Sequence, residues 1–376
     1  MMRKFLDFCK REIILTIAIL LAILSAFFVQ PDKAYLSYID VRTLAILFCL
    51  MAVMAGLQKI DFFDFIAETL LVKVKNIKGL MILLVMLCFF SSMFITNDVA
   101  LITFVPFTFI VLKFVLGERI EKLLVPIVVL QTIAANLGSM LTPIGNPQNL
   151  YLYGISGLGL GEFIKIVLPY GAVSLVLLML ICACYPYKGE KEIAFKLEKK
   201  TSLKEHKAKL TIYAILFMIS VLTVAHIIPY GYALIIIAVT IFILDKKVLL
   251  NVDYNLLLTF IAFFVFIGNM GRVPAFYELL QKWMAGNEVP ISIAASQVMS
   301  NVPAALLLSG FTTDVKALII GTNLGGLGTL IASMASLISF KFIARDYGQL
   351  KAKYMLWFTV VNIVFLAALF ILFLAL

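Results

Sequence analysis

The chain reads NLGSMLTPIGNPQNL at residues 136–150 and NLGGLGTLIASMASL at residues 323–337, with six identities in fifteen aligned positions. Both stretches lie within apolar runs and are rich in short polar side chains, and the first also holds Pro143 and Pro147. Proline removes a backbone donor and clashes with the preceding helical turn, and glycine weakens a helix. The two stretches therefore predict a duplicated helix that is interrupted near its middle.

The composition places this duplicated helix in a membrane. Hydrophobic residues make up 63% of the 376 residues and charged residues 14%, whereas a soluble domain is about 45–50% apolar and about 25% charged. So few charges cannot cover a globular surface, which excludes a cytosolic enzyme, a nucleic-acid-binding module and a disordered scaffold. The net charge of +10 then reflects basic residues that gather in cytoplasmic loops. We predict an all-α polytopic membrane protein that contacts the lipid bilayer and no nucleic acid.

Apolar segments long enough to cross a bilayer divide the chain into spans. About nine spans are predicted, at residues 13–29, 41–57, 123–152, 163–184, 210–228, 231–244, 254–270, 315–340 and 354–376. Segments 79–112 and 290–311 are instead interrupted by polar residues. The second arm of the former, 99–112, would form only about 21 Å of helix, and both arms of the latter are shorter still. Both segments are predicted as re-entrant helical hairpins.

Basic residues orient the spans. The 186–209 segment carries eight lysines against four glutamates, which places it in the cytoplasm. The basic N-terminal tail is predicted on the same side, and the number of spans leaves the C-terminus outside. Hairpin 79–112 then enters the membrane from the cytoplasm and hairpin 290–311 from outside.

The two halves of the chain have related elements in the same order. Residues 96–100, TNDVA, align with residues 300–304, SNVPA, at the tips of the hairpins. We predict two repeats of inverted topology, 1–185 and 210–376, joined by the cytoplasmic loop 186–209. Each repeat holds a hairpin and a broken helix, at 79–112 and 123–152 in the first and at 290–311 and 315–340 in the second. Many secondary transporters have this build and bind substrate near mid-membrane, where the repeats meet.

Polar groups of the hairpin tips and helix breaks form the candidate site. Unwound carbonyls, hydroxyls and amide oxygens suit Na⁺, while free N–H groups at the N-termini of half-helices attract an anion. Asp98 is the acidic residue placed deep in the membrane, which makes it a candidate Na⁺ ligand or proton carrier. A structural alternative stays open, because Asn97, Asp98, Ser300 and Asn301 are also good helix N-caps.

The sequence resembles the ion transporter superfamily, above all its divalent anion:sodium symporters, citrate permeases and arsenite permeases. The residues that carry the resemblance are Thr96-Asn97-Asp98, Thr142–Asn149, Ser300–Pro303 and Asn323–Ser336. The resemblance implies a homodimer in which the hairpins and broken helices move as an elevator against a scaffold, with Na⁺ near each tip and the anion between the tips. The symporters favour Thr as third tip residue, whereas Asp98 and Val302 stand here, as in arsenite permeases and Na⁺/H⁺ antiporters of the superfamily.

The resemblance implies two sets of candidate positions, to which Asp98 is added as the acidic residue placed deep in the membrane. The cation-binding set is Thr96, Asn97, Asp98, Gly138, Thr142, Ser300, Asn301, Gly325 and Thr329. The substrate-binding set is Asn97, Asp98, Gly145, Asn146, Pro147, Asn301, Val302, Asn323 and Ser333.

No enzyme signature and no P-loop occur in the sequence, so any pumping by this chain is expected to use an ion gradient. We predict a secondary transporter of a bacterial-type inner membrane that moves a small anion, a carboxylate or an inorganic oxyanion, coupled to Na⁺ or H⁺ and without a cofactor. The alternatives are a Na⁺/H⁺ antiporter, an arsenite-type efflux permease and, in another class, a passive channel or a non-transporting scaffold.

Overall fold

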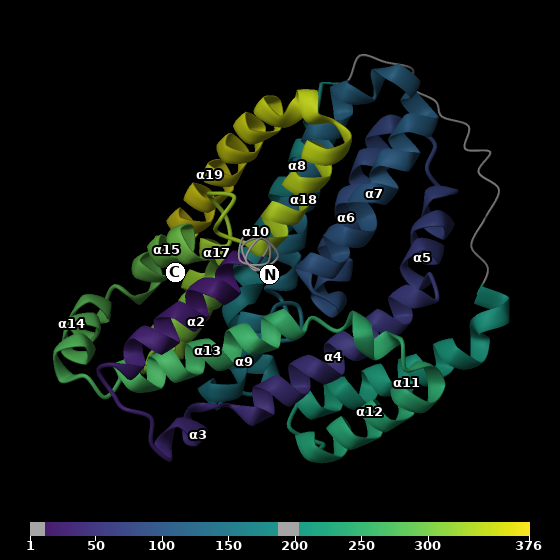
Figure 1. Ribbon diagram of the computed structural model, residues 1–376. Helices are drawn as coiled ribbons and strands as arrows, with labels where there is room; N and C mark the ends of the chain where they lie inside the picture. The colour runs from purple at the N-terminus through teal and green to yellow at the C-terminus, as the bar shows by residue number, and fades with distance from the viewer. Residues whose placement is uncertain (1–11, 187–202) are drawn as a thin grey trace, which may run out of the picture.

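A computed structural model describes residues 12–186 and 203–376, and these residues form helices and no strand (Figure 1). The basic N-terminal tail and most of the lysine-rich loop lie outside the described residues. Seven of the described helices are long and apolar enough to cross a membrane, or eight if the bent pair α13–α14 counts as one span. The described chain is thus an all-helical polytopic membrane protein.

The first half of the chain contains the first broken helix. A seven-residue break, 140–146, separates α8 from α9, within the predicted segment 123–152. Asp40 caps α4 by accepting a 3.0 Å hydrogen bond from the Thr43 N–H. The elements are α2 (Ile13–Ala26), α3 (Ala34–Tyr38), α4 (Val41–Lys59), α5 (Phe62–Leu71), α6 (Ile77–Ile95), α7 (Asn97–Leu116), η1 (Gly117–Ile120), α8 (Glu121–Ser139), α9 (Pro147–Ser156) and α10 (Leu160–Cys184).

The second half contains a matching break, 326–333, between α17 and α18. Asp253 caps α13 through the Leu256 N–H at 3.0 Å, as Asp40 caps α4. The elements are η2 (Leu203–His206), α11 (Lys207–Val224), α12 (Tyr230–Asp245), η3 (Val248–Asn251), α13 (Tyr254–Met270), α14 (Pro274–Met284), α15 (Glu288–Met299), α16 (Asn301–Ser309), α17 (Val315–Gly325), α18 (Met334–Asp346), η4 (Gly348–Leu350) and α19 (Lys351–Ala375).

The arms of the first hairpin are longer than predicted. Helices α6 and α7 have 19 and 20 residues, and each is long enough to span the membrane. The expected short arm 99–112 was therefore wrong, because α7 continues past Lys113, whose aliphatic stem can lie along the apolar surface. The arms of the second hairpin, α15 and α16, have 12 and 9 residues and are short, as predicted.

The helices pack in two groups (Figure 1). In one, α2 lies along α13, and α4 packs against α11 and α12. In the other, each hairpin packs on the first part of a broken helix, α6 and α7 on α8, and α15 and α16 on α17. The hairpin tips are consequently brought to the helix breaks.

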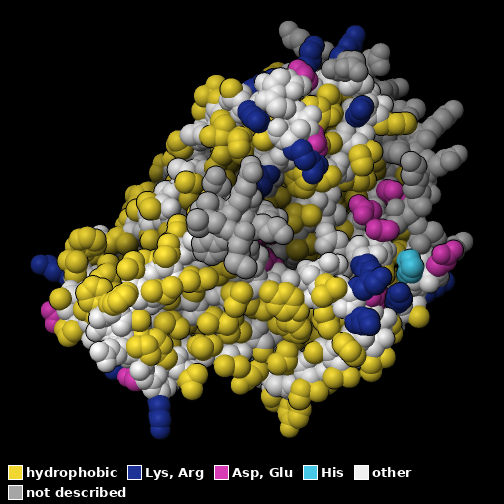
Figure 2. Space-filling view, viewed as in Figure 1, with side chains coloured by type: hydrophobic (Ala, Val, Ile, Leu, Met, Phe, Trp, Pro, Cys, Tyr) yellow, Lys and Arg dark blue, Asp and Glu magenta, His cyan; other side chains and the backbone are white. Residues whose placement is uncertain are grey.

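The surface is largely apolar (Figure 2). Large side chains such as Leu180, Ile235 and Ile363 are more than half exposed, whereas α8 is almost wholly buried. Contiguous exposed apolar surface of this extent is rare on soluble proteins and fits contact with lipid. Lys and Arg gather at the upper end of the view, where the turns α7–α8 and α18–α19 lie.

Candidate functional site

The two hairpin tips have the same unusual backbone conformation. Thr96 has φ +69° and ψ 152°, and Ser300 has φ +74° and ψ 154°. Residues with a Cβ rarely adopt this region, and holding one there costs about 1–3 kcal/mol. Asn97 and Asn301, which begin α7 and α16, are each only 4% exposed. Both tips are therefore buried and held in place by their surroundings.

Asn136 on α8 joins the first tip to the second broken helix. Its Oδ1 accepts hydrogen bonds from Asn97 Nδ2 at 2.9 Å and from the Ser333 hydroxyl at 3.0 Å. Its Nδ2 donates to the Ser336 hydroxyl at 3.3 Å and to the Gly326 carbonyl at 3.4 Å. One buried amide thus satisfies groups from three separate segments. Asn136 was not among the predicted site residues, although it aligns with Asn323, which was.

The second tip meets the same cluster from the other side. The Asn301 N–H donates to the Ala332 carbonyl at 3.0 Å, inside the second break. A Cβ added at Gly326 would lie 3.0 Å from Asn301 Nδ2, so the tip is packed directly on the residue that also bonds Asn136. Asn97 and Asn301 are linked through Asn136 and Gly326, in the buried centre of the protein.

Several of these contacts occur twice, at aligned positions in the two halves. Asn136 bonds Ser336, and its counterpart Asn323 donates to Asn149 Oδ1 at 2.7 Å, where Asn149 aligns with Ser336. The first part of each broken helix is therefore hydrogen-bonded to the second part of the other, α8 to α18 and α17 to α9.

The threonines of the breaks repeat this correspondence. Thr142 donates its hydroxyl to the carbonyl of Met93, and Thr329 donates to the carbonyl of Gln297 at 3.3 Å. Met93 and Gln297 each lie three residues before a tip. The hydroxyl of each threonine therefore joins a helix break to its hairpin by a hydrogen bond, and its proton is not available to a ligand.

Glycines allow the hairpins to approach the broken helices closely. A Cβ on Gly138 would lie 2.0 Å from the Phe89 carbonyl oxygen, and one on Gly325 would lie 2.6 Å from Ser296 Oγ. Gly145 closes a tight turn, because a Cβ there would lie 2.1 Å from the Ser139 carbonyl oxygen. All three positions need glycine for packing, and glycine has no side chain that could bind a ligand.

We predict that Gly138→Ala and Gly325→Ala lower the free energy of unfolding by about 1–3 kcal/mol, because the added methyl group pushes a hairpin off its broken helix. The measurement is thermal unfolding of the purified protein in detergent. Gly161→Ala on α10 is the matched control, since nothing lies within 4 Å of a Cβ there. An equal midpoint for Gly138→Ala and Gly161→Ala would contradict the close packing.

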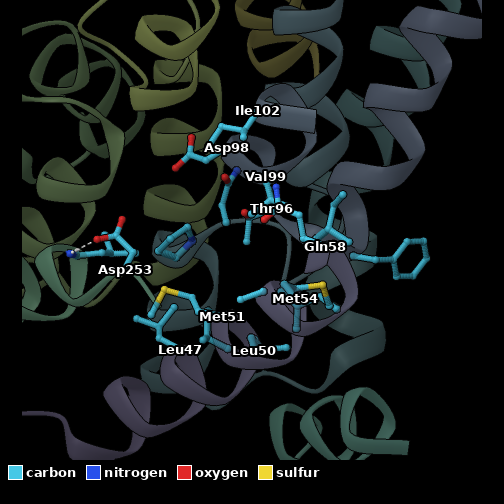
Figure 3. A pocket seen from close by; sticks show the side chains of 18 of the residues that line it. Leu47, Leu50, Met51, Met54, Gln58, Thr96, Asp98, Val99, Ile102 and Asp253 are labelled. Carbon is cyan, nitrogen blue, oxygen red and sulfur yellow. Dashed lines mark hydrogen bonds between the residues drawn. The ribbon is translucent and has the colours of Figure 1, made fainter. Parts of the chain in front are cut away.

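A cavity of about 190 Å³ lies against the first tip (Figure 3). Asp98, Thr96, Asn146 and Pro147 line it together with apolar residues of α4, and Asp253 lines its other side. The Asp98 N–H donates to Asn97 Oδ1 at 2.9 Å, whereas Asp98 Oδ1 is buried and has no hydrogen-bond partner within residues 12–186 and 203–376. No Lys, Arg or His is among the lining residues. Two carboxyl groups without a basic partner suit a cation or a proton.

The second tip faces a much smaller cavity. Val302, Pro303 and Met334 line about 30 Å³, and Asp253 lies at the edge of this space too. Val302 is apolar, so this tip offers no counterpart of the Asp98 carboxyl. The difference between Asp98 and Val302 was visible in the sequence. Asp253, which lies just before α13 and lines both cavities, was not predicted as a site residue.

Further polar atoms near the breaks are buried without a partner. Both amide atoms of Gln148 on α9 and Oδ1 of Asn323 have none among the described residues. Buried polar groups of native proteins are nearly always hydrogen-bonded, so these atoms beside the breaks are free to bind a ligand or water. Gln148 belongs to the Gly145–Asn149 motif, but its burial could not be read from the sequence.

Comparison with known proteins agrees with this architecture. A family model described as citrate transporter matches residues 5–315. The inner membrane protein YbiR of Escherichia coli is 33% identical over 333 residues, which cover 87% of each chain. An uncharacterized transporter of Methanocaldococcus jannaschii is 32% identical over 332 residues, again 87% of each chain. A silicon efflux transporter of Oryza sativa subsp. japonica is 30% identical over 158 residues, 41% of this chain and 31% of its own.

Proposed function

The chain belongs to the citrate transporter family, and from that premise we propose that this membrane transporter is a gradient-driven secondary transporter, moving a small oxygen-rich acid coupled to Na⁺ or H⁺. The observation that carries the proposal is the buried polar cluster in which Asn136 joins the first hairpin tip to the second broken helix. Such a cluster at the meeting point of broken helices is where secondary transporters bind substrate.

Four helix N-termini support an acidic substrate. Helices α7 and α16 begin at Asn97 and Asn301, and α9 and α18 follow the N-cap residues Asn146 and Ser333. Asn97 and Ser333 bond the same Asn136 oxygen, so two of these ends converge directly. Free N–H groups and the positive end of the helix dipole favour a carboxylate or an oxyanion there. The unpaired amide of Gln148 adds a donor and an acceptor.

The coupling cation is proposed to bind at the first tip. Asp98 supplies the buried, unpartnered carboxyl oxygen, and Thr96 lines the same cavity. Asn97 lies beside Asp98 at this tip, and Gly138 and Thr142 hold the hairpin and the break in place around it. A buried carboxylate is unfavourable unless a cation or a proton neutralises it, and this requirement would link substrate movement to the ion.

The inverted repeats and the elevator motion are part of this proposal. The duplicated contacts of the two breaks and the shared conformation of Thr96 and Ser300 support two related halves. The proposed moving part is α6–α9 with α15–α18, and the proposed scaffold is α2, α4 and α11–α13, which pack among themselves. A homodimer through the scaffold, a cytoplasmic N-terminus and an external C-terminus complete the arrangement.

A second candidate is efflux of an uncharged hydroxylated acid in exchange for a cation. It is favoured by the cavity at the first tip, where Asp98 and Asp253 would repel an anion and no basic side chain compensates. One relative is a silicon efflux transporter, which supports a substrate of this kind. Both candidates use the same coupling carboxyl and differ in the charge of the substrate.

We expect the purified protein in liposomes to accumulate its substrate only while a Na⁺ or H⁺ gradient is imposed. One charge moving through 100 mV supplies about 2.3 kcal/mol, enough for roughly 50-fold accumulation. The assay compares citrate and inorganic phosphate with silicic acid, inside and outside loading, and each gradient separately. Uptake that only equilibrates, at a rate independent of both gradients, would indicate a passive channel instead.

A further inference from the structure

The side chain of Gln297 closes over the second helix break. Its Nε2 donates to the carbonyl oxygens of Gly325 and Leu327, both at 2.9 Å, and lies 3.2 Å from the Ile293 carbonyl oxygen. Its Oε1 accepts the Thr329 N–H at 2.9 Å. A single side chain therefore satisfies three backbone groups of the segment that unwinds between α17 and α18.

The partners fix which way the amide points. Carbonyl oxygens only accept hydrogen bonds and a backbone N–H only donates one, so Nε2 must face Gly325 and Leu327 while Oε1 faces Thr329. Gly328 makes room for this arrangement. It has φ +105°, and a Cβ there would lie 2.3 Å from Gln297 Oε1.

The corresponding contacts in the first half are longer and come from another side chain. Met93 stands at the position of Gln297, and its thioether cannot donate a hydrogen bond. Asn149 Nδ2 instead lies 3.4 Å from the carbonyl oxygens of Ser139 and Met140 and 3.5 Å from that of Thr142, against 2.9 Å for the two shortest contacts of Gln297 Nε2. The cavity beside the first tip is also the larger, about 190 Å³ against about 30 Å³ beside the second.

An amide NH₂ group that lies between converging carbonyl oxygens stabilises them electrostatically, as a small bound cation would. It places partial positive charge where unwound carbonyl oxygens point, and it does so permanently. We propose that Gln297 takes the place of a coupling cation in the second half, so that the protein binds one coupling cation, at the first tip. This inference rests on the proposed function and replaces a second cation site at Ser300, Asn301, Gly325 and Thr329.

The test measures cation binding by thermal unfolding of the full-length protein in detergent. Each variant is heated in sodium chloride and in choline chloride of equal ionic strength at alkaline pH. Asn97→Ala removes the first site, and we expect no sodium-dependent shift in this protein. Adding Gln297→Glu replaces the donor with a carboxylate oxygen facing two carbonyls, and we expect sodium then to raise the midpoint by about 3 °C at saturating concentration.

The matched control is Asn97→Ala with Gln281→Glu, the same change on exposed α14, which should show no sodium effect. If the Gln297→Glu protein does not fold, Gln297→Met, which copies Met93, is used and should also gain a sodium shift. A sodium shift in Asn97→Ala alone would overturn the inference, as would no gain in the Gln297 variants over the control. Failure of accumulation in liposomes would overturn the proposed function and leave this binding result standing.

Discussion

Asn136→Ala is expected to fold and to transport at less than about 1% of the wild-type rate. The substitution removes the acceptor of Asn97 Nδ2 and of the Ser333 hydroxyl, and the donor to Ser336. Each buried group left unpaired costs about 1–3 kcal/mol, and here that cost falls on the contacts that hold a tip against the opposite break. A displacement of about 1 Å at such a site can reduce a rate about 100-fold. The measurement is initial uptake into liposomes per reconstituted protein.

The control for this variant is Asn362→Ala on α19. Asn362 is also fully buried, but its amide only donates to the Phe358 carbonyl one turn earlier, at 2.8 Å. We expect this change, which removes one hydrogen bond, to lower the unfolding midpoint less than Asn136→Ala does and to leave at least half of the transport rate. A loss of transport that in both variants is proportional to the fall in the unfolding midpoint would mean that Asn136 matters for stability alone.

The helices were largely predictable because their limits depend on local signals. The observed bounds of α13, Tyr254–Met270, match the predicted span 254–270, with Asp253 as cap before it. Both breaks fall where glycine, proline and short polar residues cluster. The end of α7 was missed, since helix continues past a charged residue when its stem can lie along the apolar surface.

The partners within the site could not be predicted, because they come from distant parts of the chain. Asn149 and Asn323 are 174 positions apart, and the bond between them depends on how the two broken helices cross. The burial of Gln148 could not be predicted either, because the motif that contains it indicates only a turn and the start of a helix. The duplicated asparagines 136 and 323 were the available signal, as both occupy the same place in the repeated motif.

The two halves correspond in backbone and differ in chemistry. Thr96 and Ser300 share φ and ψ values, yet one tip continues with Asp98 and the other with Val302. Met93 and Gln297 accept the same threonine contact through their carbonyls and carry unlike side chains. The ionisable residue of the first pair, Asp98, is in the first half. Met93, whose side chain does not donate a hydrogen bond to the break, is in the first half too. Coupling to a cation is therefore best tested at the first tip.

We expect Asp98→Asn to separate substrate movement from the ion gradient. The carboxyl oxygen Oδ1 is buried with no partner in the part of the chain that the structure describes, and Asp253 faces the same cavity, so a charged Asp98 needs a cation or a proton beside it. Asparagine has nearly the same shape as aspartate and is always neutral. The variant should therefore complete its conformational change without binding the coupling ion. In liposomes, gradient-driven accumulation should fall from roughly 50-fold to about onefold, while equilibrative exchange of labelled substrate continues.

The transport rate of the wild-type protein should depend on pH or on the concentration of the coupling cation. The transport rate of Asp98→Asn should show no such dependence. Asp40→Asn is the matched control, because Asp40 accepts the Thr43 N–H at the start of α4 and is not among the residues that line the cavity. An amide oxygen can still accept that hydrogen bond, so Asp40→Asn should keep the wild-type profile. If Asp98→Asn retains both the accumulation and the pH and cation profile of the wild type, Asp98 is a helix-start residue without a part in coupling. The coupling ion would then have to bind through carbonyl and hydroxyl oxygens of the first tip alone.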